Sequence, residues 1–277
     1  MTQLARPDLA RNREDHVRPR PASATTRPLG GDKPGLLADG WLRLLPAGRT
    51  GLLAADQPVP GWAVGTAFLA PVILVGGWLA AGALQPASYS PMRQTMSALA
   101  GQSGADRWVM TAALLLVGGC QIATGAGLTG AGRPARILLV LTGISTLGIA
   151  ASPEPAAGPT PRHLAFAVSC VVTTAVWPLL VARRTPRASW ILSFYGCAAA
   201  TAIFAALSCW LLIEAREGGG YLGLAERLTS AVLGLFPLVV ALALRQIARD
   251  AASEPQRRRE PIRVPAGNYA DRPGGQS

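Results

Sequence analysis

The residues of this chain that could take part in chemistry stand in pairs, each at the start of a long apolar segment. The three pairs are Asp106-Arg107, Arg162-His163 and Glu226-Arg227. If each segment begins a helix, the unpaired amides and positive dipole end of its first turn attract anions. Neighbouring arginines could add charge-assisted hydrogen bonds to a phosphate or carboxylate. The pairs therefore predict a site for an anionic group, provided that the three helix starts lie at one end of the fold.

The elements that must position these pairs are six apolar segments, each long enough to cross the hydrocarbon layer as a helix. They lie at 62–84, 108–128, 134–152, 163–182, 188–213 and 225–244. Half of the 277 residues are hydrophobic and 15% are charged, whereas soluble domains carry about 25% charged residues. Alternation of polar and apolar residues is absent, so the spans must be helices. We predict an all-α fold, a polytopic membrane bundle of six transmembrane helices over 61–246.

The basic residues are distributed unevenly between the two sides of this bundle. Five of the 26 fall on the side that follows the first, third and fifth spans, namely Arg93, Arg107, Arg162, Arg216 and Arg227. The others lie in two Arg- and Pro-rich tails, 1–60 and 247–277, and around the remaining span ends. The positive-inside rule therefore places both termini in the cytoplasm. We expect both tails to be disordered. The near absence of lysine indicates a high-G+C bacterial genome, hence the bacterial cytoplasmic (inner) membrane.

The longest outer loop, about Gln85 to Arg107, adds Arg93 and Ser97 to the candidate site. Ser90-Pro91 is typical of an N-cap and first helical position, and Gly101 of the residue past a helix end. We expect a short amphipathic helix here, at the outer interface. The candidate ligand-binding residues are Arg93, Ser97, Asp106, Arg107, His163, Glu226 and Arg227.

Two kinds of role remain open for these residues. They could hold a lipid headgroup or another small anion at the outer face. They could instead be purely structural, since acidic residues stabilise helix starts and arginines anchor in the headgroup region. The leading hypothesis is a non-enzymatic membrane protein with such a ligand.

His163 is the weak candidate for a catalytic residue. Ser97, His163 and Asp106 supply the residue types of a hydrolytic triad, but no nucleophile-elbow pattern surrounds Ser97. A membrane enzyme acting on a lipid or lipid-linked substrate, with His163 as base, is therefore the second hypothesis. A third is a structural or assembly partner that acts through its basic tails.

Several other classes are disfavoured. The interiors of the spans carry no Asp, Glu, Lys, Arg or His, which proton relays and many ion-coupled carriers need. The four cysteines lie in apolar runs without CxxC spacing, and one well-placed histidine cannot supply a zinc or haem site. We therefore expect no metal and no cofactor. The position of the arginines beside apolar runs indicates membrane lipids, not nucleic acid, as partners. The oligomeric state is left open.

Several short motifs resemble a known family. They are Tyr89-Ser-Pro-Met-Arg93, Ser97-Ala-Leu-Ala, Asp106-Arg-Trp108-Val-Met-Thr, His163-Leu-Ala-Phe-Ala, Trp177-Pro-Leu-Leu and Glu226-Arg-Leu. Together they are similar to the six-span bacterial family known as domain of unknown function 998, over roughly Gly61 to Arg245. The resemblance implies an integral membrane protein without an established activity. It carries over no catalytic role, but its motifs coincide with the polar residues of the outer face.

Overall fold

The computed structural model describes residues 58–183 and 189–259. The tail predicted at 1–60 falls almost entirely outside these ranges, as does the part of the C-terminal tail from 260 onward. Six helices in the described ranges are long and apolar enough to cross a membrane. They are α3 (Gly61–Ala83), α5 (Trp108–Gly127), α6 (Arg133–Ala150), α7 (Pro161–Val181), α8 (Phe194–Glu217) and α9 (Leu222–Arg259). The prediction of an all-α bundle with six spans is confirmed.

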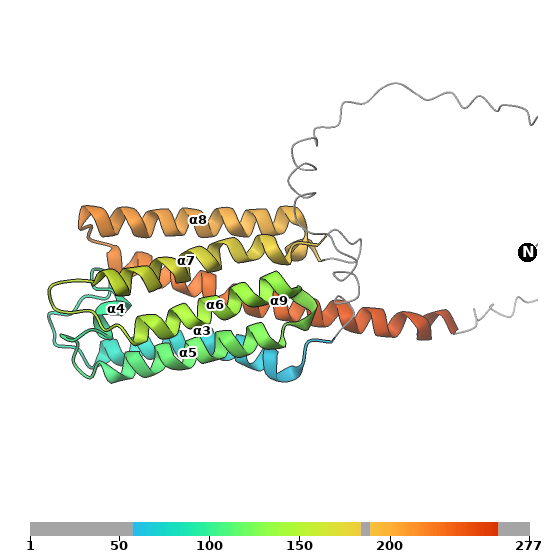
Figure 1. The fold of residues 1–277 in the computed structure, drawn as a ribbon, viewed down its shortest axis with the longest axis horizontal. Helices are drawn as coiled ribbons and strands as arrows, with labels where there is room; N and C mark the ends of the chain where they lie inside the picture. The colour runs from blue at the N-terminus through green and yellow to red at the C-terminus, as the bar shows by residue number, and fades with distance from the viewer. Residues whose placement is uncertain (1–57, 184–188, 260–277) are drawn as a thin grey trace, which may run out of the picture. The chain divides into compact units, whose positions relative to one another are not determined.

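The long helices form a closed ring in chain order. Each packs against the next, from α3 through α5, α6, α7 and α8 to α9, and α9 packs back against α3. Consecutive long helices run in opposite directions, so neighbours in the ring are antiparallel (Figure 1). The chain between α3 and α5 contains the short helix α4 (Met96–Leu99) at one end of the bundle. We call this the first-loop end; α7 and α9 also begin there.

The outside of the ring is apolar, and the inside contains buried side chains. Large side chains such as Phe68, Val72 and Leu116 are about half exposed. A soluble protein rarely exposes this much contiguous apolar surface, whereas a hydrocarbon environment accepts it. Trp177 is buried in the interior, and its Nε1 donates to the Ala135 carbonyl at 2.7 Å. The chain is therefore a multi-pass membrane protein.

The start of the short loop helix differs from the sequence prediction. We expected Ser90 as its N-cap, but the amides of Arg93 and Gln94 both bond to the Ser90 carbonyl in an isolated turn. The helix begins at Met96 with Thr95 as N-cap, because the Thr95 hydroxyl accepts from the Ala98 amide at 2.9 Å. The helix end was predicted correctly, since Gly101 directly follows the C-cap residue.

Two spans also have bounds different from those expected. α8 begins at Phe194, not at 188, because residues Trp190–Leu192 form a 3₁₀ turn and Ser193 caps the helix. α9 continues through Arg259, past the expected end at 244. Ile247 packs against the core and Ala248 is buried, so the helix retains an inward-facing side beyond the predicted boundary. The C-terminal segment that we expected to be disordered from 247 is thus helical as far as Arg259.

Candidate functional site

The first turn of α9 contacts the chain between α3 and α5. Gly223 approaches that segment closely: a Cβ at this position would lie 2.3 Å from the Gln94 carbonyl oxygen and 2.5 Å from that of Pro91. The Leu224 amide donates to the Met92 carbonyl at 3.1 Å. The two charged residues that follow, Glu226 and Arg227, extend this contact on different parts of the same segment.

Arg227 binds protein oxygen atoms with both terminal nitrogens. Its Nη1 donates to the carbonyls of Pro91 (2.7 Å), Gln94 (2.8 Å) and Gly223 (2.9 Å). Its Nη2 donates to the hydroxyl of Tyr89 at 2.6 Å. The side chain is buried, so these contacts satisfy a charge that would otherwise be costly. Arg227 therefore holds the segment in place, and its terminal nitrogens are engaged by the protein.

Glu226 binds the next part of the same segment. Its Oε2 accepts from the Met96 amide, and its Oε1 accepts from the Ser97 hydroxyl at 3.2 Å. The Met96 amide lies in the first turn of α4, where helix amides lack intrahelical partners. Glu226 therefore stabilises the start of this helix from the neighbouring element. The structure brings together two of the predicted site residues, Ser97 and Glu226, with Arg227 beside them.

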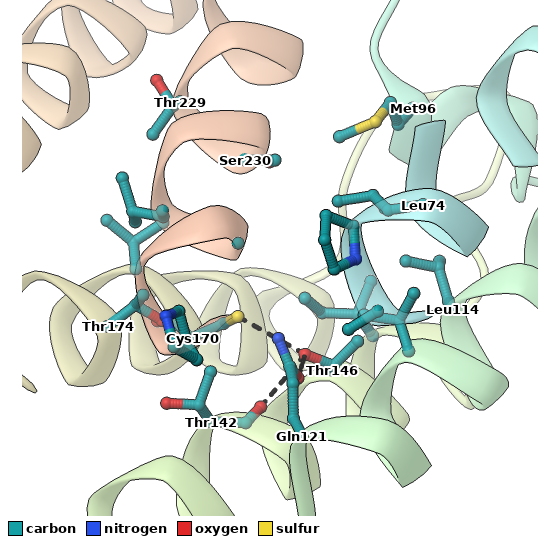
Figure 2. Close-up of a pocket in the computed structure, with 18 of the residues that line it drawn as sticks. Leu74, Met96, Leu114, Gln121, Thr142, Thr146, Cys170, Thr174, Thr229 and Ser230 are labelled. Atoms are coloured by element: carbon teal, nitrogen blue, oxygen red, sulfur yellow. Dashed lines mark hydrogen bonds between the residues drawn. The ribbon is translucent and has the colours of Figure 1, made fainter. Parts of the chain in front are cut away.

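A cavity extends from Ser97 and Glu226 into the interior of the bundle. Its volume is about 160 Å³, and residues of all six long helices line it together with Met96 and Ser97. Figure 2 shows Ser230 of α9 across this space from Leu74 and Met96, with Gln121, Thr146 and Cys170 on a further wall. Glu226 is the single charged residue among the described residues that line it.

Most of the polar side chains on the cavity wall are hydrogen-bonded to other protein groups. Thr146 Oγ1 donates to Gln121 Oε1 at 2.8 Å, and the Cys170 thiol lies 3.5 Å from the same hydroxyl. Thr124 and Thr66 share a hydrogen bond of 2.9 Å. The rest of the wall is apolar, including Leu114, Val117 and Leu233. The space is thus apolar with hydroxyl patches and has a carboxyl at one end.

His163 belongs to a second polar group at the first-loop end. It is buried at the start of α7, and its Nδ1 lies 2.8 Å from the Ser152 carbonyl oxygen. Because a carbonyl only accepts, Nδ1 carries a hydrogen and donates it in this contact, which leaves Nε2 free of it. The ring interacts electrostatically with Glu154. Burial raises the pKa of the Glu154 carboxyl, and His163 partly opposes this effect.

The loop between α6 and α7 connects this second group to the first. The Gln102 amide donates to the Glu154 carbonyl at 2.8 Å, and a Cβ at Gly101 would lie 2.8 Å from the same oxygen. The charge of Glu154 is close enough to act on that of Glu226. One carboxyl oxygen of Glu154, Oε2, and the hydroxyl of Ser152 are buried without a hydrogen-bond partner. Two neighbouring carboxyls are therefore found at this end of the bundle.

The remaining predicted site residues are not part of either group. Arg93 and Asp106 are exposed, and Asp106 adopts a positive φ of 47° in the turn before α5. The Arg107 guanidinium stacks over the Trp108 ring, 4.3 Å from its centroid, an arrangement that suits an interfacial anchor. In the described ranges, no hydrogen bond joins Ser97, His163 and Asp106, since Ser97 donates to Glu226 and His163 contacts Ser152.

Two features of the site were missed from sequence. Tyr89 was noted as an interfacial aromatic, yet its hydroxyl accepts a hydrogen bond from a buried guanidinium. Glu154 was not considered, although it stands between two prolines in a short loop next to the His163 span. A carboxyl so confined beside a membrane segment was the signal that could have drawn attention to it.

Comparisons with known proteins give a family without a described activity. No curated protein and no solved structure shows a significant match to this chain. The family model described as "Protein of unknown function (DUF998)" matches residues 68–243, which cover four of the six membrane helices in full and most of α3 and α9. The chain is therefore a member of the DUF998 family of membrane proteins.

Proposed function

We propose that the protein binds a small amphiphilic molecule inside its helix bundle, with the polar end of the ligand at Ser97 and Glu226. The observation that carries this proposal is the cavity, which is apolar along most of its wall and has one charged residue at its end. Ligand sites are typically of this kind, mostly apolar with a few convergent polar groups. A carboxyl that faces apolar space gains free energy when a polar group pairs with it.

The size of the cavity limits the ligand. Its volume of about 160 Å³ is close to that of cavities of about 150 Å³ that hold benzene in other proteins. A ring or a short alkyl chain with one polar substituent fits, whereas a phospholipid does not. The binding role expected from sequence is kept, but its place moves from the outer surface into the bundle.

The anionic ligand expected from sequence has less support at this site. The Arg227 guanidinium, which was expected to bind it, donates to four protein oxygens.

We retain the topology predicted from the arginines as part of the proposal. Both termini then lie in the cytoplasm of a bacterium, and the first-loop end with Ser97 and Glu226 lies near the outer face of the inner membrane.

Filling the cavity tests this proposal. Gly234 lines the cavity, and a Cβ placed there meets no atom within 4 Å, so Gly234→Leu should occupy the space without a clash. Gly119 of α5 also has open space around its Cβ but is exposed and does not line the cavity. Gly119→Leu is therefore the matched control, with the same gain in helix propensity.

The assay is calorimetric titration of benzyl alcohol into the full-length protein in lipid nanodiscs. We expect saturable binding to the wild type and to Gly119→Leu, and loss of the saturable component in Gly234→Leu. Partition into the lipid contributes equally to all three titrations and cancels. Equal heats for the three proteins would show that the cavity binds no ligand of this size.

A membrane enzyme with His163 as general base remains the second candidate. The observation that favours it is the hydrogen bond from Nδ1 to the Ser152 carbonyl, which leaves Nε2 as the basic nitrogen. His163 does not line the cavity, so the two candidates concern different places. His163→Ala should abolish turnover of a lipid substrate under this hypothesis and should leave benzyl alcohol binding intact. The third hypothesis, a partner that acts through its tails, concerns residues outside the described ranges.

A further inference from the structure

The one charged residue on the described cavity wall, Glu226, is acidic. Both oxygens of Glu226 accept from neutral donors, the Met96 amide and the Ser97 hydroxyl. Arg227 acts on this carboxylate electrostatically, but its hydrogen bonds go to Tyr89 and to backbone carbonyls. In the described part of the chain, Glu226 has no hydrogen bond to a basic side chain.

A second carboxyl, outside the cavity wall, also acts on Glu226. Glu154 acts electrostatically on Glu226 and has one buried oxygen without a hydrogen-bond partner. His163, the basic side chain that interacts with Glu154, does not line the cavity. A ligand that enters the cavity therefore meets one carboxylate directly and a second one nearby, with no uncommitted cation on the cavity wall.

This arrangement selects the chemistry of the ligand. A carboxylate against apolar space is stabilised most by a charged donor, because charge-assisted hydrogen bonds are strong and the surroundings screen them weakly. An anionic group would be repelled by both carboxylates. We infer that the ligand is a small organic cation, a protonated amine on a ring-sized or short-chain apolar body, with its ammonium group on Glu226. This inference rests on the proposed binding in the cavity and specifies the class of ligand.

Three probes of equal shape test the charge of the ligand. Benzylamine, benzyl alcohol and benzoate differ at the polar end, and at neutral pH they are cationic, neutral and anionic. Each is titrated into the full-length protein in nanodiscs of phosphatidylcholine, which has no net charge. We expect benzylamine to bind the wild type about tenfold or more tightly than benzyl alcohol, as a hydrogen bond to a charged group predicts, and benzoate to bind weakest.

Two variants test which carboxyl causes the preference for benzylamine over benzyl alcohol. Glu226→Gln keeps a side-chain oxygen that can accept from the Met96 amide but removes the charge, so the ratio of benzylamine affinity to benzyl alcohol affinity should fall to about one. Glu154→Gln, which lies outside the cavity wall, should reduce the preference by a smaller factor, since its charge acts from farther away. Gly119→Leu should show the wild-type preference.

The outcomes separate the two proposals. If none of the three probes binds the wild type saturably, the proposed function is wrong. If benzyl alcohol binds and benzylamine binds no more tightly, the cavity is a ligand site but the inferred charge is wrong. Tightest binding of benzoate would restore the anionic ligand expected from sequence. The wild-type comparison decides this even if Glu226→Gln fails to fold.

Discussion

Replacement of Arg227 by methionine tests whether one buried guanidinium holds the segment between α3 and α5 on the bundle. Methionine keeps the approximate length of the side chain and removes every donor. The carbonyls of Pro91 and Gln94 then lose their hydrogen bonds of 2.7 and 2.8 Å, and Tyr89 loses its bond of 2.6 Å. Both bonds are partly buried, so each carbonyl left unpaired costs about 1 kcal/mol, the lower end of the range for buried groups, which gives about 2 kcal/mol for the two.

The change with the lowest free-energy cost is release of the segment, which lets water bind these carbonyls. We therefore expect local opening around residues 89–97 while the long helices stay folded. Hydrogen exchange measured by mass spectrometry on the full-length protein in detergent micelles should show this. A loss of 2 kcal/mol corresponds to more than a tenfold change in an opening equilibrium. Peptides that contain the Met96 amide should thus exchange at least about tenfold faster, and peptides from the middle of α5 should not change.

Arg93→Met is the matched control, because Arg93 lies on the same segment but is exposed. It removes the same charge and should leave exchange unchanged. If both variants exchange at the wild-type rate over residues 89–97, the hydrogen bonds of Arg227 do not hold the segment. If Arg227→Met accelerates exchange equally in all helices, the residue supports the whole bundle and the reasoning about local release is wrong.

Two further predictions concern packing and protonation. Gly77→Ala should lower the apparent Tm in detergent, because its Cβ would lie 2.4 Å from the Ala113 Cβ and overpacking costs about 1–3 kcal/mol. Gly76→Ala meets no atom within 4 Å and should be neutral or stabilising, so equal effects would contradict this account of the α3–α5 contact. Burial raises the pKa of Glu154 above 4.5, so the folded state binds its proton more tightly than the unfolded state does. The contribution of protonated Glu154 to the free energy of unfolding is then complete below about pH 4.5. It is lost as the pH rises through the pKa of Glu154 in the folded state. Glu154→Gln should therefore flatten the pH dependence of Tm above pH 4.5, and an unchanged slope would refute this role.

The membrane architecture could be predicted because it depends on local composition. Each span is a long run of apolar residues, and a chain in lipid must satisfy its backbone within the helix. The span ends were less well predicted where tertiary contacts set them. Ser193 caps α8 after a 3₁₀ turn, and the inward side of α9 at Ile247 prolongs that helix.

The site could be predicted only in part, because its contacts join residues far apart in the chain. Glu226 was named as a candidate from its position at a helix start and Ser97 as a polar residue of the first outer loop, and they meet in the structure. No local pattern indicated that Arg227 would bind the carbonyls of Pro91 and Gln94. Those carbonyls are engaged by a residue more than a hundred positions later, which is why the helix expected from Ser90 does not form there.

The contact between the start of α9 and the α3–α5 segment also sets an order for biosynthesis. The chain emerges from the ribosome with residues 89–97 long before Gly223, Glu226 and Arg227. Until α9 is inserted, the segment lacks the carboxylate and guanidinium that bind it, and the ring of helices lacks the member that joins α8 to α3. Assembly of the interior therefore waits for the last described helix, and a chain cut short before α9 would leave the bundle open to the quality-control proteases of its membrane.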